Sequence, residues 1–338
     1  MKTHSLASTL LAALLLLTAS ARAATYTWTG AGFMGSQDYL FSNPYNWAGL
    51  DAPSAGEANV TLVFSNGYPK TITNDIAGLA VASIRFQGSN YVIHGKPSGN
   101  TLTLRSTSLG GYSILATGNN CQFAGNCPLV LSNGGFVNVG ALNTLKMSSV
   151  LSGPGGIIKA GPGTLLFNAT LANTYAGPTT VSDGILDLQN GLFVFSSFVP
   201  YVSVPGPLVI GNGDLDYSPV VRLLADNQIA DDAAVTVNEN SKLWLNTQDD
   251  TLGPLTLRGG LVNTGQGGSS TSPGTLTLNG NVTNQLSSLD GYHGSISGRL
   301  GLPTTGVHFV KGASHDYHPV RLPGDCVDAA VGTATRIK

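Results

Sequence analysis

The chain has 338 residues, of which only 34 are formally charged (16 Lys+Arg and 18 Asp+Glu), about 10% against roughly 25% in ordinary soluble proteins. A net charge of −2 excludes the basic surface that nucleic-acid binding needs, and the scarcity of charge excludes coiled coils and charge-rich disordered chains. Glycine supplies 44 residues. Together with many Ser, Thr and Asn residues, this glycine content favours an all-β protein with frequent turns.

Residues 1–23 are predicted to form a secretory signal peptide. They begin with Lys2 and His4, continue with an apolar run over Leu10–Leu17, and end in Ala21–Ala23, which places small residues before a cleavage point. The apolar run is shorter than the roughly 20 residues of a transmembrane helix. We therefore expect an exported chain, extracellular or on the outer cell surface, that is not an integral membrane protein.

Short alternating runs of apolar and polar residues recur along the rest of the chain, often about 8 to 12 residues apart, and turn formers separate them. Alternation at period two is typical of half-buried strands. The clearest runs are Thr101–Leu104, Leu186–Leu188, Val235–Val237, Leu243–Leu245, Leu255–Leu257 and Thr275–Leu278. Three phrases, at 161–167, 253–257 and 273–278, are variants of one sequence. Such self-similarity predicts an all-β solenoid built from short, glycine-rich repeats.

Two cysteines flank the turn-rich segment Cys121–Cys127. In an oxidising compartment this spacing favours a small disulfide loop between Cys121 and Cys127, and two free thiols are the alternative. Cys326 is left over. The pair alone is a poor zinc signal, because zinc needs two further ligands at a suitable spacing.

The most regular repeat covers residues 153–188. Its spacing reads Lys-x-Gly-x-Gly-Thr-Leu, then Asn-Thr-Tyr-x-Gly-x-Thr, then Gly-x-Leu-x-Leu. The residues that carry this pattern are Gly161, Gly163, Thr164, Leu165, Asn173, Tyr175, Gly177, Thr179, Gly184 and Leu186. The segment resembles the autotransporter-associated β-strand repeat, and the opening Tyr26–Gly30 and the stretch Pro207–Gly211 resemble other parts of passenger-type proteins. The resemblance implies a right-handed parallel β-helix outside the cell, with a structural or adhesin-like role and no catalysis.

The resemblance also suggests how the chain is organised. Residues 24–150 would form an N-terminal β-rich part of the solenoid, residues 151–190 the repeat, and residues 191–338 further degenerate repeats. The end of the chain, from Ala329 to Lys338, echoes Val150–Lys159 and stops where the next Gly-x-Gly-Thr-Leu strand should follow. We therefore expect a chain that is cut off inside a repeat.

A glycoside hydrolase is the less favoured of two alternative functions, and it arises because right-handed β-helices also form the scaffold of pectin-acting enzymes. Those enzymes carry an Asn-Thr-Asp motif, an Asp pair, Gly-His-Gly and Arg-Ile-Lys, which Asn246–Asp250, Gly291–Gly294 and Arg336–Lys338 approximate in order. However, Gln248 replaces the expected acid and Tyr292 interrupts the Gly-His-Gly. A turn before the next strand explains Asn246–Asp250 equally well, so we expect no enzyme.

Three other features are candidate binding sites. His315 and His318 lack a third metal ligand nearby. Asp214 and Asp216 lack the regular spacing of calcium-binding solenoids, and Asp231-Asp232 is most simply a turn. We therefore expect no metal and no cofactor.

Three tryptophans are the best candidates for contact with sugar. Trp28, Trp47 and Trp244 would form a carbohydrate platform if they were exposed, and core or stacking positions if they were buried. A polysaccharide-binding module is therefore the more favoured of the two alternative functions. The sequence does not identify the binding partner. The candidates are an extracellular polysaccharide and the surface of a host or neighbouring cell, and nucleic acid is not among them.

Overall fold

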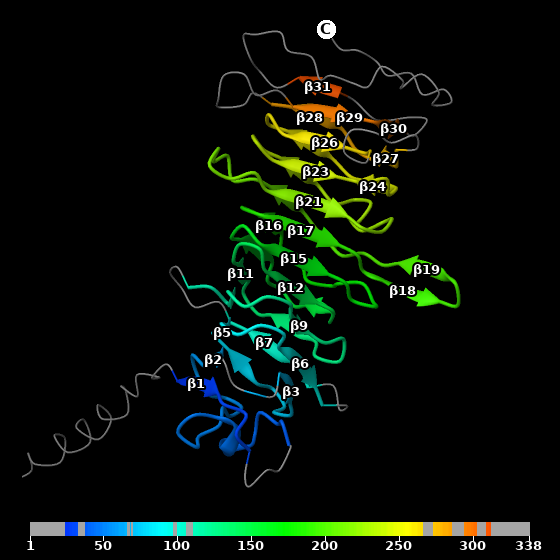
Figure 1. Cartoon of the computed structure of the whole chain (residues 1–338). Helices are drawn as coiled ribbons and strands as arrows, with labels where there is room; N and C mark the ends of the chain where they lie inside the picture. The colour runs from blue at the N-terminus through cyan, green and yellow to red at the C-terminus, as the bar shows by residue number, and fades with distance from the viewer. Residues whose placement is uncertain are drawn as a thin grey trace, which may run out of the picture.

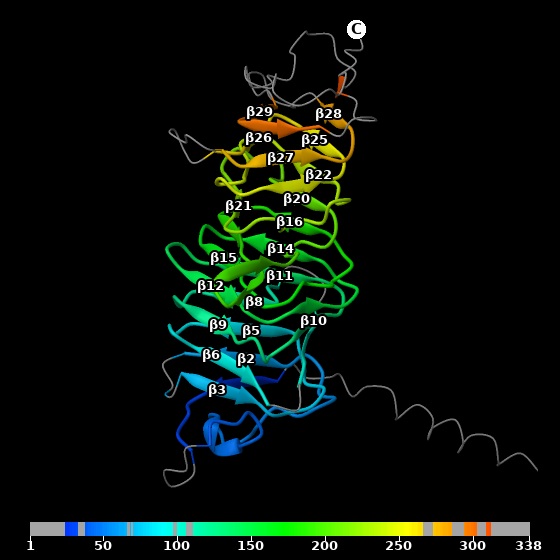
Figure 2. The same cartoon turned by 90° about the vertical axis from the view of Figure 1, so that its right-hand side faces the viewer.

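The computed structural model describes residues 24–32, 38–65, 68, 70–96, 100–105, 111–265, 273–285, 294–302 and 309–311. Their strands stack into one elongated column that runs from β1 at one end to β31 at the other (Figures 1 and 2). Among the described residues all strand pairs are parallel except one hairpin. The predicted signal peptide, Cys326 and the predicted truncation point lie outside the described residues.

Sheet 1 is the longest sheet and contains twelve described strands. In stacking order they are β1 (Thr25–Trp28), β2 (Thr61–Phe64), β5 (Ser83–Phe86), β8 (Ile114–Ala116), β11 (Gly135–Val139), β14 (Ile157–Ala160), β16 (Thr179–Val181), β20 (Leu208–Ile210), β22 (Val235–Val237), β25 (Leu255–Leu257), β28 (Val282–Asn284) and β31 (Phe309–Lys311). Gly135 pairs with Ile157, and Ile157 with Thr179, so one coil takes 22 residues here (157 − 135 and 179 − 157).

Sheet 2 follows sheet 1 within each coil and contains ten described strands. They are β3 (Thr71–Asn74), β6 (Val92–Gly95), β9 (Cys121–Phe123), β12 (Thr144–Met147), β15 (Thr164–Phe167), β17 (Ile185–Leu188), β21 (Val220–Leu223), β23 (Lys242–Trp244), β26 (Leu261–Asn263) and β29 (Ser295–Ser297). Because the chain passes from sheet 1 to sheet 2 in every coil, each strand finds its partner in the coils before and after it.

The third position of the coil is less regular. One group of strands consists of β4 (Ala80–Val81), β7 (Leu102–Leu104), β10 (Leu129–Leu131) and β13 (Leu151–Ser152), and a second of β24 (Asp250–Leu252), β27 (Thr275–Leu278) and β30 (Arg299–Gly301). Between the two groups the chain forms loops and the antiparallel hairpin β18 (Gly191–Val194) and β19 (Ser197–Pro200). A short 3-10 helix, Pro44–Asn46, lies near the N-terminal end.

The core runs through the centre of the column. Inward-facing residues alternate with outward-facing ones along most strands, and the inward ones are fully buried aliphatics. Near the N-terminal end aromatic rings replace them: Phe64 stacks on Phe86 with ring centroids 5.5 Å apart, and Phe86 contacts Phe123 at 5.6 Å. Stacking equivalent side chains on successive coils removes apolar surface from water without charged groups, which accounts for the composition. The expected fold class, an all-β solenoid of parallel sheets, is confirmed.

Candidate functional site

The glycines of the repeat form a tightly packed corner between sheets 1 and 2. A Cβ on Gly163 would lie 2.1 Å from the Gly140 carbonyl oxygen of the previous coil. Gly161 and Gly184 have positive φ values of 73° and 68°, and a Cβ on Gly184 would lie 2.4 Å from the Gly161 oxygen. Side chains at this corner would push successive coils apart, so these repeat residues set the spacing of the stack.

The polar residues of the repeat also bind neighbouring coils. Asn173 is buried; its side-chain oxygen accepts from the Leu151 N–H (2.9 Å) and its NH₂ donates to the Ser203 carbonyl (2.8 Å). The hydroxyls of Tyr175 and Thr179 share a hydrogen bond of 2.5 Å inside the core. Thr164 donates its N–H to the Asn143 carbonyl, and the apolar members Leu165 and Leu186 pair across β15 and β17.

The lysine of the repeat, Lys159, lies inside the protein with no exposed surface. Its ammonium donates to three carbonyl oxygens, those of Ala160 (3.0 Å), Gly161 (2.6 Å) and Asp183 (2.9 Å). Burial lowers the pKa of this lysine to about 8, and the Asp183 charge opposes the shift. Because Asp183 belongs to the following coil, Lys159 links two coils and is not available to a ligand.

The two aspartates of the candidate hydrolase motif, Asp249 and Asp250, differ in solvent exposure. Asp250 is buried, and its carboxylate accepts from the N–H groups of Gln228 (3.0 Å) and Ile229 (3.2 Å), as well as that of Thr251 (2.8 Å). Burial raises the pKa of Asp250 to about 7, although the N–H donors oppose the rise. Asp249 is exposed and accepts from the Thr275 N–H (2.6 Å). The two carboxylates therefore do not face one accessible point, as paired acids in glycoside hydrolysis must.

The rest of that motif is a turn. Asn246 and Thr247 have positive φ values of 51° and 72° between β23 and β24, and the Gln248 N–H donates to the Leu245 carbonyl (2.9 Å). Residues 291–293 and 336–338 lie outside the described residues, and so do His315 and His318.

Asp250 belongs to a buried polar network that the sequence analysis did not identify. The Gln228 side chain accepts from the Asn190 N–H (2.7 Å) and the Ser203 hydroxyl (2.6 Å), and donates to the Asn190 carbonyl (3.0 Å). Asn190 in turn accepts from the Ala169 N–H (2.8 Å). In these coils the third position has no strands, and the backbone groups there are satisfied by side-chain hydrogen bonds instead. The sequence pattern indicates one residue beside this network, Asn173 of the repeat, which donates to the Ser203 carbonyl.

The remaining acidic candidates form turns. The Asp214 N–H donates to the Asn212 side chain (3.0 Å), and the Asp216 N–H donates to the Asp214 carboxylate (3.1 Å), as in consecutive Asx turns. Asp231-Asp232 forms part of the turn before β22, in which the Ala233 N–H donates to the Ala230 carbonyl (2.9 Å). Within the described part of the chain no three His, Cys, Asp or Glu residues gather as metal ligands.

The disulfide expected between Cys121 and Cys127 is not formed: both thiols are free and buried. Cys121 begins β9 in sheet 2, where its thiol donates to the Gly88 carbonyl (3.3 Å). Cys127 follows the turn after β9, just before β10 in the third position. The five intervening residues thus carry the chain from one face of the solenoid to the next, so each thiol enters a different part of the core. Burial raises the pKa of Cys127 to about 12.

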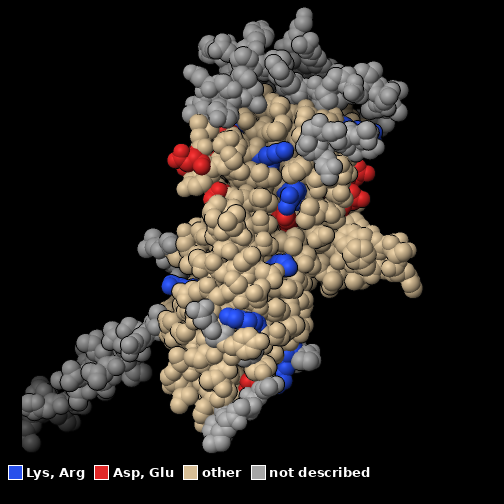
Figure 3. Space-filling view, in the orientation of Figure 1, with Lys and Arg blue, Asp and Glu red and all other residues tan. Residues whose placement is uncertain are grey.

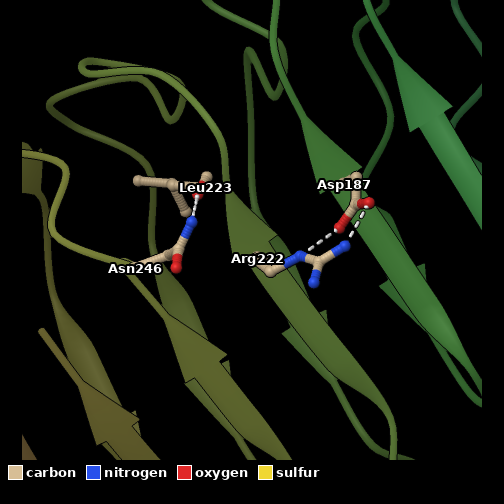
Figure 4. Close-up of polar contacts among 4 residues, drawn as sticks. All are labelled: Asp187, Arg222, Leu223 and Asn246. Atoms are coloured by element: carbon tan, nitrogen blue, oxygen red, sulfur yellow. Dashed lines mark hydrogen bonds and ion pairs between the residues drawn. The ribbon is translucent and has the colours of Figure 1, made fainter. Parts of the chain in front are cut away.

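The outer face of sheet 2 carries the clearest charged contact. Arg222 on β21 donates from Nε and Nη2 to the two oxygens of Asp187 on β17, at 2.8 and 2.7 Å (Figure 4). One strand further, the Asn246 NH₂ donates to the Leu223 carbonyl (3.3 Å). Lys242 lies over the ring of Trp244 at 4.5 Å, and the indole N–H donates to the Gly265 carbonyl (2.6 Å). This face is held together by contacts between strands.

The other two tryptophans are buried. Trp28 and Trp47 are each 1% exposed, with ring centroids 5.1 Å apart, and the Trp47 indole donates to the Phe41 carbonyl (2.7 Å). They close the N-terminal end of the core, so the platform hypothesis for these two residues is wrong.

The most accessible apolar feature is the hairpin β18–β19, which the sequence analysis did not identify. It projects sideways from the column, and its surface in Figure 3 carries neither acidic nor basic colour. Its stem is anchored by the Gly191 N–H, which donates to the Ala169 carbonyl (2.9 Å), and by the Tyr201 N–H, which donates to the Asn190 carbonyl (2.9 Å). The signal in the sequence is a stretch of 26 residues, 188–213, without a charged side chain.

Comparison with known proteins identifies the repeat. Residues 157–188, which span β14 to β17, match the family model of the passenger-associated-transport-repeat. No curated protein and no solved structure matches the chain significantly. No helix among the described residues is both long enough and apolar enough to cross a membrane. The chain therefore combines a β-solenoid with a segment, residues 157–188, that is similar to the passenger-associated-transport-repeat.

Proposed function

We propose that this protein is an exported, non-enzymatic passenger-type solenoid that acts as a structural or adhesin-like rod at the cell surface or outside the cell. The supporting observation is the use of its polar groups. Four buried polar residues form hydrogen bonds to neighbouring coils: Lys159, Asn173, Gln228 and Asp250. Because these four groups hold neighbouring coils together, none of them is available to a substrate as an acid, base or nucleophile.

In this proposal residues 1–23 direct export and residues 24–150, 151–190 and 191–338 are three stretches of one solenoid. The partner is an extracellular polysaccharide or another cell surface. A dedicated polysaccharide platform is less well supported, because the exposed aromatic residues of the described chain are scattered over the short 3-10 helix, separate loops and the hairpin. These residues are Tyr45, Tyr68, Phe193, Phe195 and Tyr217.

Export is tested by expressing the full chain in a Gram-negative bacterium and following it into the periplasm, the outer surface and the medium. The matched variant carries Leu14→Arg and Leu15→Arg, which interrupt the apolar run of the proposed signal peptide. We expect the parent chain outside the cytoplasm and the variant inside it. Retention of both chains in the cytoplasm would contradict the proposal.

The absence of glycosidase activity is tested separately with polygalacturonate. We expect no release of reducing ends by the parent chain. Release that disappears in Asp250→Asn, while the urea midpoint of that variant stays unchanged, would show that Asp250 is catalytic.

A further inference from the structure

The hairpin β18–β19 carries apolar side chains on both of its faces, and two exposed serines, Ser196 and Ser197, lie at its tip. Strand pairing places Leu192 opposite Val199 on one face and Phe193 opposite Phe198 on the other. Leu192 and Val199 are 39% and 38% exposed, and Phe193 is 73% exposed although its ring contacts that of Phe198 at 5.0 Å. Antiparallel hairpins on soluble proteins usually turn one polar face to water, so this hairpin lacks a side suited to water.

The tip of the hairpin carries a fully exposed aromatic ring at a strained position. Phe195 is the most exposed large apolar residue of the described chain, and its φ is 53°. Hairpin turns usually place Gly, Asn or Asp at such positions, because most other side chains are strained there. Phe195 therefore lowers the local stability of the turn, and it places an apolar ring at the end of the hairpin away from the column.

The stem is rigid enough to hold that ring away from the body. Gln228 fixes Asn190 by two hydrogen bonds, and Asn190 precedes the first residue of β18. The four residue pairs of the hairpin extend it by about 14 Å at 3.4 Å per residue. Figure 1 shows the hairpin reaching sideways beyond the coils above and below it, so its tip would meet a flat surface before they do.

We propose that the hairpin tip, Phe193–Phe198, inserts into the interfacial region of a lipid bilayer. The bilayer interface surrounds an inserted tip on all sides, and this matches a hairpin that carries apolar side chains on both faces and an exposed phenylalanine at its tip. The two serines of the tip, Ser196 and Ser197, would lie at the level of the polar headgroups. A groove on a protein would cover one face and leave the other wet. The 26 uncharged residues at 188–213 offer no electrostatic attraction to lipid headgroups, so the binding is carried by apolar burial.

A second copy of the chain fits the hairpin less well. Two exposed phenylalanines and the partly exposed aliphatic residues present roughly 500 Å² of apolar surface, against about 800 Å² per partner in a stable protein–protein interface. The outer edges of a two-stranded ribbon also keep unpaired N–H and C=O groups. These cannot enter hydrocarbon without cost, which limits insertion to the tip.

The test uses full-length Phe195→Trp and vesicles of phosphatidylcholine with brominated acyl chains. The matched control is Leu142→Trp, because Leu142 is 96% exposed with a φ of 62° on the turn between β11 and β12. Both variants keep residues 1–23 and the natural tryptophans, so the difference between them reports the position of the added indole. We expect its emission to shift to shorter wavelength and to be quenched only in the Phe195→Trp variant.

A second measurement is co-sedimentation with unlabelled phosphatidylcholine vesicles. Phe195→Ser should lower the partition coefficient at least about 10-fold, since burying a phenylalanine is worth about 1.5–3 kcal/mol, whereas Leu142→Ser should leave it unchanged. Equal quenching at both positions, or binding that disappears at about 0.5 M salt, would overturn the proposal. Lipid-independent dimerisation that Phe195→Ser abolishes would also overturn it and would assign the hairpin to a second copy.

Discussion

Gly163→Ala tests whether the glycine corner sets the spacing of the coils. A Cβ at this position would lie 2.1 Å from the Gly140 oxygen and 2.8 Å from the Asn143 oxygen, both backbone atoms of the previous coil. Ordinary contacts of this kind are longer than 3.0 Å. The two coils must therefore separate by about 1 Å at this corner, because neither backbone atom can rotate away.

The cost follows from the hydrogen bonds at the corner. The Gly163 N–H donates to the Val139 carbonyl and the Thr164 N–H to the Asn143 carbonyl, both at 2.9 Å. A shift of about 1 Å breaks both, at about 0.5–1.5 kcal/mol each, and overpacking adds about 1–3 kcal/mol. We expect Gly163→Ala to lower the free energy of unfolding by about 2–6 kcal/mol.

The matched control is Gly206→Ala. A Cβ on Gly206 would meet its nearest atom, the Gly177 oxygen, at 3.8 Å, which is an ordinary contact. Alanine there should stabilise the chain by about 0.4–1 kcal/mol through the entropy of the unfolded state. Urea denaturation compares the variants, and amide hydrogen exchange localises the effect to β12, β15 and β17. Equal stability of the two variants within about 0.5 kcal/mol would refute the reasoning.

Three further predictions concern buried or partly buried groups. The pKa of Asp250 is raised to about 7 in the folded chain, so folding takes up a proton between about pH 4 and 7. The contribution of this group to the free energy of unfolding therefore falls as pH rises through that range, by up to about 4 kcal/mol in total. Asp250→Asn should remove this pH dependence from urea denaturation curves. Cys121 and Cys127 should not react with a thiol reagent in the native chain, and both should react after unfolding in urea. If a disulfide joined them, neither would react in urea. Arg222→Met should lower the urea-derived stability by about 1–3 kcal/mol, because it leaves the nearly buried carboxylate of Asp187 without its bidentate partner; unchanged stability would make the ion pair incidental.

Local patterns predicted the regular part of the fold well. The alternating runs at 235–237, 255–257 and 275–278 are the strands β22, β25 and β27. These strands could be found from the sequence because period two along a strand and repetition between coils both report one buried face. The repeat at 153–188 was identified by its resemblance to a known family pattern, and the family match covers residues 157–188 of it.

Features that depend on distant partners could not be predicted. Gln228 contacts Asn190 across 38 residues, and no local pattern encodes that pairing. The spacing of Cys121 and Cys127 does not reveal that a corner lies between them. The run Leu192–Phe195 has the composition of a buried strand, and only its place outside the column exposes it.

The central claim, that the solenoid stands outside the cell, is tested most directly by labelling intact bacteria with a membrane-impermeant maleimide. The reporter is Leu142→Cys in a Cys326→Ser background, since Leu142 is 96% exposed whereas Cys121 and Cys127 are fully buried. We expect equal labelling of the Leu142→Cys chain in intact and lysed cells, and none of the same chain without that substitution. Labelling that occurs only after lysis would contradict the claim.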